Sequence, residues 1–405
     1  MKKITTRLLL LNKKTIIYSL IISLFTWLFT FLIHINIKAL TIIDTGLDDV
    51  DLTDIVYSRS SKSTNSIHTI ENKNIVLINS GDLKRYDLAR LLSKLEEYQV
   101  RVIGIDIIFK NLVGNLADTL LADVISKNDN LVFATLIEDQ KKMMVKNSNS
   151  FFKIKAEGYT NFYNLKDSLS VVREFKSYIY HKKDTLHSFA LSIVKKIDPI
   201  SYNKMIKCHK KGMLINYSGN ENNFIILEGD SILHSQRSFE KELYDKVVLV
   251  GKINTTPNSK NSTLEDRFYT PMNSIIFGKS YPDASGLIIQ ANILSMILDG
   301  KYIKKSSNLF NLITVLIITY LVVTLFLRIE HYYRTWHHII IKILQIIFSI
   351  IVVLISILIY ENLRFKFNTG FLLTNIIISA EMLSLIHAVE KSYFNPLIKA
   401  KTEKN

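Results

Sequence analysis

Cysteine is almost missing from this chain, since Cys208 is the only cysteine among its 405 residues. An internal disulfide is therefore excluded, and a domain outside the cytoplasm must be held by its own core or by partners. The sequence also lacks a phosphate-binding glycine loop, an HExxH pair, a GxSxG elbow, and Cys or His pairs at metal-ligand spacing. These absences predict that the chain is not an enzyme and has no catalytic residue, no metal site and no cofactor.

Acidic residues are outnumbered by basic ones, 36 against 51, which gives a net charge of +15. Such an excess can indicate nucleic-acid binding, but no basic stripe interleaved with aromatic residues occurs here. Part of the excess lies in segments next to long apolar runs, where it sets membrane orientation instead. We therefore expect no nucleic-acid partner.

Long apolar runs are present at both ends of the chain. One covers residues 15–35, and three follow near the C-terminus, at 309–327, 339–360 and 370–389. Each is long enough to cross a hydrocarbon core of about 30 Å as a helix. The stretch between them, residues 36–308, is water-compatible and can bury a large core. The sequence therefore predicts one N-terminal span, a large domain, and three C-terminal spans in the lipid bilayer.

Positive charge near the membrane ends predicts the orientation of these spans. The tail at residues 1–14 holds five Lys or Arg residues, and the tail at 390–405 is also basic, whereas the loop between spans three and four has only Arg364 and Lys366. We expect both tails in the cytoplasm and the large domain outside a bacterial cytoplasmic (inner) membrane, in the periplasm. Three lysines just before span two oppose this assignment, but the charges before span one outweigh them: Lys301, Lys304 and Lys305.

A cleaved signal peptide is the alternative for the first run. Its apolar length of about 21 residues exceeds the usual 7–15 of a signal core, and no small-x-small cleavage site follows. An uncleaved anchor is the better interpretation.

The large domain begins with near-continuous apolar strands that alternate with helical patterns. Strands are predicted at 74–79, 101–109 and 131–137, and helices at 86–98 and 116–126. This alternation is typical of a parallel sheet covered by helices on both faces. The second half is mixed, with β segments at 159–165, 171–180, 213–217, 224–227 and 246–251, and helices at 185–196 and 286–298. The expected fold is an α/β domain with a mostly parallel sheet.

Four sequence blocks in this domain occur in the order of a known family. They are IVLINSGDLKRYDLARLLSKLEEYQVRVIGIDIIF (75–109), GYTNFYNLKDSLSVVREF (158–175), KVVLVGKIN with DRFYTPM (246–254 and 266–272), and YPDASGLIIQANILSMILDGKYI (281–303). Together they resemble the CHASE type 2 domain, a cyclase/histidine-kinase-associated sensory extracellular domain, with its core at 74–303. Two departures occur: Gln290 stands where the family often has a His, and the loop at 83–86 lacks the usual Trp-Pro segment.

The resemblance implies a sensory or ligand-binding role outside the membrane. Proteins of this kind often carry a cytoplasmic kinase, cyclase or phosphatase domain, which the tail at 390–405 is too short to hold. We therefore expect a sensor that relays through its helices to a separate protein partner in the inner membrane or envelope, with an unknown small ligand. The alternative is a structural or accessory subunit of a larger cell-envelope complex, and an enzyme in the outer domain is a third possibility.

Two acids are candidate ligand-binding residues. Asp82 follows a buried strand, at the sheet edge where open α/β folds bind ligands, although it could instead cap the next helix. Asp106 stands inside an apolar strand, where an unpaired carboxylate is costly, so we expect an Arg or backbone N–H partner and a structural role before a catalytic one. The resemblance adds further candidates for the same cleft: Asn161, Arg173, Asp266, Thr270, Gln290 and Asn292.

Two ionisable residues lie in the last apolar run. Glu381 is near its middle and His387 follows six residues later. Such groups usually face the interior of a helix bundle and often have a function. For Glu381 we expect a hydrogen-bonded contact with Asn375 or with a polar group on another span, in preference to a proton path.

Overall fold

The computed structural model describes residues 13–34, 51–62, 74–114, 116–139, 144–162, 170–181, 184–208, 212–253, 266–273, 281–333 and 335–394. The chain divides into two compact units. One comprises residues 46–303, and the other joins residues 1–45 to residues 304–405.

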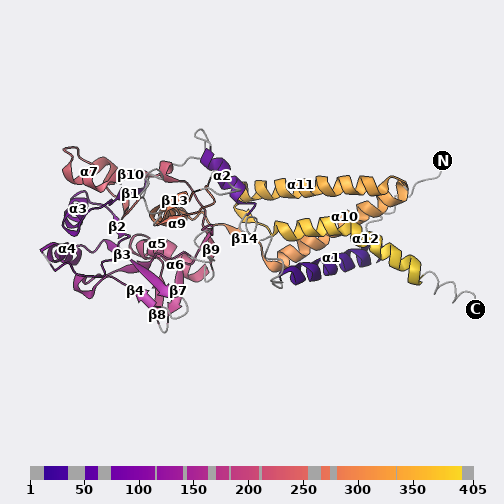
Figure 1. Cartoon of the computed structure of the whole chain (residues 1–405), viewed down its shortest axis with the longest axis horizontal. Coiled ribbons are helices and arrows are strands. Elements are labelled where there is room, and N and C mark those ends of the chain that lie inside the picture. The colour runs from indigo at the N-terminus through magenta and orange to yellow at the C-terminus, as the bar shows by residue number, and fades with distance from the viewer. Residues whose placement is uncertain are drawn as a thin grey trace, which may run out of the picture. The chain divides into compact units, whose positions relative to one another are not determined.

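The unit at 46–303 is built on a seven-stranded sheet in the order β10-β1-β11-β2-β3-β4, with β5 beside β3 (Figure 1). The strands are β1 (Ile75–Asn79), β2 (Val102–Ile105), β3 (Leu131–Asp139), β4 (Met144–Lys146), β5 (Glu157–Tyr159), β10 (Ile225–Glu228) and β11 (Val247–Gly251). Only β4 runs antiparallel to its neighbour. The carboxyl ends of β1, β11 and β2 therefore meet at one edge of the sheet.

Helices cover both faces of this sheet, as the apolar strands require. One face packs against α3 (Arg85–Glu97), α4 (Leu116–Lys127) and α7 (Gly229–His234). The other faces α5 (Phe189–Ile197), which contacts β2 and β3, and α9 (Gly286–Asp299), which contacts β1 and β11. Every residue of α9 from Gly286 to Ile297 is buried, so this helix is part of the domain core.

The predicted mixed α/β fold with a mostly parallel sheet is confirmed, and the elements expected over 74–137 agree with the structure apart from their ends. The largest such difference is in β2, which ends at Ile105 and leaves Asp106 just beyond the strand. The α9 prediction also agrees to within one residue.

The helix predicted over 185–196 is wrong at its start. Residues Asp184–His187 form β8, which pairs antiparallel with β7 (Tyr178–His181), and α5 begins only at Phe189. The Ser188 hydroxyl accepts a hydrogen bond from Leu191 N, so it caps the helix there and separates it from the strand.

Three predicted β segments are shorter than expected. Of 159–165 only Tyr159 lies in a strand, and residues 163–165 are outside the described chain. Of 171–180 only β6 (Glu174–Phe175) and the start of β7 are strands, and of 213–217 only β9 (Met213–Leu214), which pairs with β6. The remaining described α-helices and strands of this unit are α2 (Asp54–Lys62), α6 (Pro199–Cys208), α8 (Glu240–Leu243), β12 (Arg267–Phe268) and β13 (Ala284–Ser285).

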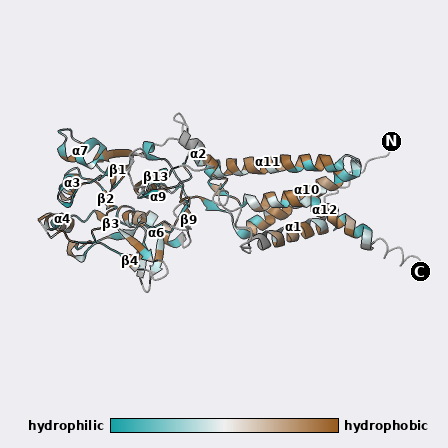
Figure 2. Cartoon of the chain, viewed as in Figure 1, coloured by the Kyte–Doolittle hydropathy of each residue, from teal (hydrophilic) through white to brown (hydrophobic). Residues whose placement is uncertain are grey.

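The second unit is a bundle of α1 (Lys13–His34), α10 (Asn308–Tyr332), α11 (His337–Leu363) and α12 (Thr369–Val389). Apolar side chains pack between them and are also exposed on their outer surfaces. The brown segments of these helices in Figure 2 mark their hydrophobic residues. Among the described residues, three helices are long and apolar enough to cross a membrane: Asn308–Tyr332, His337–Leu363 and Thr369–Ser392. Helix α1 packs against α10 and α12, and its role as a span stays a prediction.

Candidate functional site

The carboxyl edge of the parallel sheet holds Asp106 directly after β2. Its backbone N–H donates to Val250 O at 2.8 Å, which fixes Asp106 beside the end of β11. The neighbouring strand ends in Gly251, where a Cβ atom would stand 3.2 Å from Asp106 Cβ. Glycine therefore leaves the room that the Asp106 side chain needs. This position at the sheet edge replaces the predicted one inside a strand.

A second carboxylate, that of Asp266, lies at the start of α9. Gly286 N donates to Asp266 O at 3.3 Å. A Cβ atom at Gly286 would stand only 3.0 Å from Asp266 Oδ1, so the carboxylate rests against the first residue of the helix. Asp266 has a φ of 65°, a left-handed conformation that Asp tolerates better than most residues.

Asp106 lies close enough to Asp266 to be affected by its charge. Burial, with a smaller contribution from the Asp266 charge, raises the pKa of Asp106 to about 7. Burial likewise raises the pKa of Asp266 to about 6, although the residue as a whole keeps solvent exposure. Within the described chain neither carboxylate has an ion-pair or hydrogen-bond partner, so the Arg or N–H partner expected for Asp106 is not found there. The pair can accept hydrogen bonds or attract positive charge, and it takes up a proton near neutral pH.

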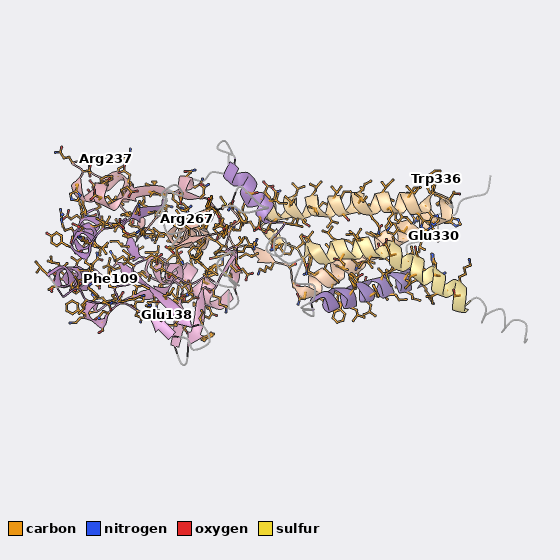
Figure 3. All side chains as sticks on the ribbon, in the orientation of Figure 1. Phe109, Glu138, Arg237, Arg267, Glu330 and Trp336 are labelled. Carbon is orange, nitrogen blue, oxygen red and sulfur yellow. The ribbon has the colours of Figure 1, made fainter. Side chains whose placement is uncertain are left out.

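Asp283 is a third acid with a raised pKa; it is half-buried and lies on the segment that leads into α9. Thr270 donates to its carboxylate through both its backbone N–H and its hydroxyl. Burial raises the pKa of Asp283 to about 6, and the Thr270 hydrogen bonds oppose this rise. Arg267, labelled in Figure 3, donates to Asp283 O at 3.0 Å. The predicted residue Thr270 is thus engaged with an acid that the sequence analysis did not select.

Ser285 was also missed. It occupies the N-cap position of α9 but makes no capping hydrogen bond, and its hydroxyl is buried without a partner among the described residues. Both Asp283 and Ser285 belong to the YPDASG segment. Polar side chains immediately before a mainly apolar helix were the signal that could have identified them.

The three predicted residues with amide side chains form hydrogen bonds to backbone atoms of other segments of the domain. Asn161 accepts from Ile137 N at 2.7 Å and donates to Ile137 O at 2.9 Å, which extends the edge of β3. Gln290 donates to Thr160 O at 3.1 Å. Asn292 accepts from Ser218 N and donates to Gly219 O, at 2.7 and 2.9 Å, so it holds a loop against α9.

Arg173 forms a bidentate ion pair with Asp54. Its Nε and Nη2 atoms lie 3.1 and 2.6 Å from the two carboxylate oxygens, and both side chains are largely buried. Tyr217 lies close enough to be affected by both charges. Burial is the main cause of the rise in the pKa of Tyr217. Arg173 is therefore engaged with an acid of α2 and not with the Asp106–Asp266 pair.

Asp82 is solvent-exposed and 3.1 Å from Lys252 Nζ. The N-cap residue of α3 is Lys84, so the alternative role of Asp82 as that cap is wrong. Of the eight predicted ligand-binding residues, the structure brings Asp106 and Asp266 together and places Asp82 on the same sheet edge.

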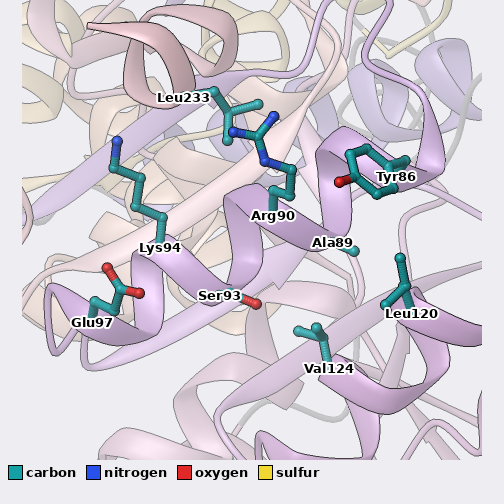
Figure 4. A pocket seen from close by; sticks show the side chains of 9 residues that line it. All are labelled: Tyr86, Ala89, Arg90, Ser93, Lys94, Glu97, Leu120, Val124 and Leu233. Carbon is teal, nitrogen blue, oxygen red and sulfur yellow. The ribbon is translucent and has the colours of Figure 1, made fainter. Parts of the chain in front are cut away.

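A separate hollow of about 340 Å³ lies over the outer side of α3. Figure 4 shows the side chains that line it: Tyr86, Ala89, Arg90, Ser93, Lys94, Glu97, Leu120, Val124 and Leu233. Lys94 donates to Ile232 O at 2.6 Å and thereby joins α3 to the end of α7. No group of three or more His, Cys, Asp or Glu side chains in the described segments could hold a metal ion.

The two ionisable residues of α12 contact polar groups on other helices. Glu381 pairs with Lys342 of α11, and His387 Nδ1 lies 3.1 Å from Glu330 Oε1 of α10. Asn375 accepts instead from Thr319 at 2.7 Å. Of the two contacts expected for Glu381, the one with a polar group on another helix is present.

Comparison with known proteins gives one match, to the family described as the CHASE2 domain, over residues 30–327. This is more than half of the chain and includes the whole sheet, both carboxylates and α9. No curated protein and no solved structure matches the chain.

Proposed function

The chain belongs to the CHASE2 domain family, whose members are extracellular sensory domains, and from this premise we propose that it is a membrane-anchored sensor. In this proposal the domain at 46–303 lies outside the cytoplasmic membrane and detects a ligand or a proton at the Asp106–Asp266 pair. The chain has four spans with both termini in the cytoplasm, and the signal passes through its helices to a separate output protein. The basic tails at residues 1–14 and 390–405 support this orientation.

One observation carries the proposal: the Asp266 carboxylate rests against Gly286, the first residue of α9, and its charge acts on Asp106. A change in charge there acts on a helix N-terminus, where the backbone N–H groups favour negative charge. Because α9 is buried along its length, it can shift only against its neighbours in the core. It ends at Asp299, and Gly300 in a left-handed conformation closes it eight residues before α10 begins at Asn308. Displacement of α9 is therefore the route that we propose from the site to the spans.

Removing the charge of Asp106 should change the dynamics of α9 and α10. We expect Asp106→Asn to alter amide hydrogen exchange in the first turn of α9 and in the first turns of α10, measured by mass spectrometry on the full-length protein in detergent. Asp82→Asn is the matched control, because it removes a carboxylate from the same sheet edge without touching α9. Amide exchange that changes in α9 but not in α10 would contradict transmission from the site to the spans. So would exchange that changes equally in the Asp106→Asn and Asp82→Asn variants.

The separate output protein is tested by purifying the tagged full-length chain from its own membranes in mild detergent and identifying partners by mass spectrometry. A stoichiometric kinase, cyclase or regulator is the expected result. Stoichiometric envelope or secretion components would instead support the structural-subunit alternative.

That alternative is favoured by one feature of the domain. The segment between β2 and α4, together with the first residue of α4, exposes three apolar side chains, Leu112, Val113 and Leu116, by 44%, 62% and 70%. Exposed apolar groups close together in the chain are typical of a protein contact surface. If the chain is a structural subunit, replacing these three side chains by Ser should release its envelope partner, whereas Asp106→Asn should not.

A further inference from the structure

Two short strands join the loop in front of α10 to the loop between α11 and α12. β14 (Lys304–Lys305) and β15 (Phe365–Lys366) pair in parallel, and Lys304 N donates to Arg364 O at 2.9 Å. Ser306 N donates to Lys366 O at the same distance. These segments, residues 304–306 and 364–367, are here called the ribbon. It stands at the end of the bundle where α10 and α12 begin and α11 ends.

The ribbon brings four cations together from two distant parts of the sequence: Lys304, Lys305, Arg364 and Lys366. Three of them are exposed, and Lys366 is half-buried. Glu361, in the last turn of α11, is the acid nearest to them in the sequence. Because backbone hydrogen bonds fix the two strands, the backbone holds the four cations near one another. In the orientation proposed above, the ribbon lies outside the cytoplasm. Lysines there are unusual, since positive charge normally collects on the cytoplasmic side of a membrane.

Aromatic rings adjoin these cations. Phe365 and Phe367 lie 4.9 Å apart between ring centroids, and each lies 5.8 Å from Phe310 in the first turn of α10. Leu309 and Leu363, at the ends of two spans, are 66% and 70% exposed. Positive charge directly beside exposed apolar and aromatic groups matches the boundary between lipid headgroups and acyl chains.

We propose that the ribbon binds the phosphate of an anionic phospholipid in the leaflet from which the chain enters α10. The four cations face the phosphate, and the phenylalanines and leucines lie against the upper acyl chains. A free phosphate ion would use the cations but gain nothing from the apolar groups, which is why the lipid is the occupant that fits. The ribbon also ties the entry of α10 to the turn between α11 and α12, so a bound lipid holds three helix ends together.

The test uses the full-length protein in detergent with equal amounts of phosphatidylglycerol and phosphatidylcholine, and bound lipids are counted by native mass spectrometry. One variant replaces the four ribbon cations by Gln, and a control replaces four exposed lysines of the other unit: Lys127, Lys153, Lys195 and Lys241. We expect the ribbon variant to lose phosphatidylglycerol by about tenfold or more, since each cation near an anionic surface contributes on the order of 1 kcal/mol. The control should retain it. Equal retention in the two variants would overturn the proposal.

Two further measurements separate lipid from free phosphate and guard against misfolding. Phe365→Ala with Phe367→Ala should weaken phosphatidylglycerol binding, whereas a site for free phosphate would be indifferent to this change. Wild-type binding should fall as salt is raised, because salt screens exposed charges. Phosphatidylglycerol binding that does not change with salt concentration would exclude a lipid site. So would binding that inorganic phosphate abolishes while the phenylalanine variant binds normally.

Discussion

Replacing Asp106 by Asn is expected to stabilise the protein at pH 8 by roughly 2–4 kcal/mol, because one pKa unit corresponds to about 1.4 kcal/mol. The pKa of Asp106 rises from 3.8 to about 7 on folding. Above pH 7 the native state must therefore hold a buried charge that the unfolded state keeps in water. Asparagine has a similar shape and carries no charge, so the variant escapes this cost.

The sign of the pH dependence follows from the same shift. Asp106 is protonated in both states below pH 3.8, and it lowers stability progressively as pH rises from there to about 7, where the folded carboxyl ionises. The stabilisation by Asp106→Asn should thus be large at pH 8 and less than half as large at pH 5, measured as the shift in unfolding midpoint of the full-length protein. Asp82→Asn, at an exposed carboxylate, should change little at either pH. A less stable Asp106→Asn variant at pH 8 would show that the carboxylate accepts hydrogen bonds that an amide cannot replace.

Replacing Arg173 by Met is expected to destabilise the domain by about 3–5 kcal/mol, the usual cost of removing one member of a buried ion pair. The change leaves the carboxylate of Asp54 buried without its bidentate partner. Denaturant unfolding of the full-length protein measures the effect through the midpoint.

The double variant Asp54→Asn with Arg173→Met provides the control, since it removes both charges. It should recover much of the lost stability, because no isolated charge then remains in the core. A double variant that is less stable than Arg173→Met alone would show that Asp54 stabilises α2 by other contacts. Arg173→Lys should fall between the wild type and Arg173→Met, because lysine keeps the charge but not the fork of two donors.

The sequence predicted the sheet well because the strands carry their own signal. β1, β2 and β11 are short runs rich in buried Val, Ile and Leu, β3 begins with a longer apolar run, and the helix between β1 and β2 has a clear apolar side. The hairpin of β7 and β8 could not be separated from α5 in this way, because Leu186 and Phe189 fit the apolar side of a helix as well as they fit a strand followed by a cap.

The candidate site was only partly predictable. Asp106 could be selected as an acid inside a predicted apolar strand, and Asp266 only from the family resemblance, but their proximity depends on two glycines, Gly251 and Gly286, that let side chains approach the backbone. Nothing local in the sequence reveals that Arg173 pairs with Asp54, because 119 residues separate them. A long-range ion pair of this kind is decided by tertiary packing and not by pattern.

The order of the sheet also governs how the domain can be assembled during synthesis. β11 lies between β1 and β2, yet it is the last of the seven strands to be made. β1 and β2 therefore have no common partner until residue 247 has emerged, and the centre of the sheet stays open for most of translation. Contacts so distant in sequence slow folding and leave unpaired strand edges exposed in the meantime. We therefore expect the growing chain to be most prone to aggregation before its final strand is made.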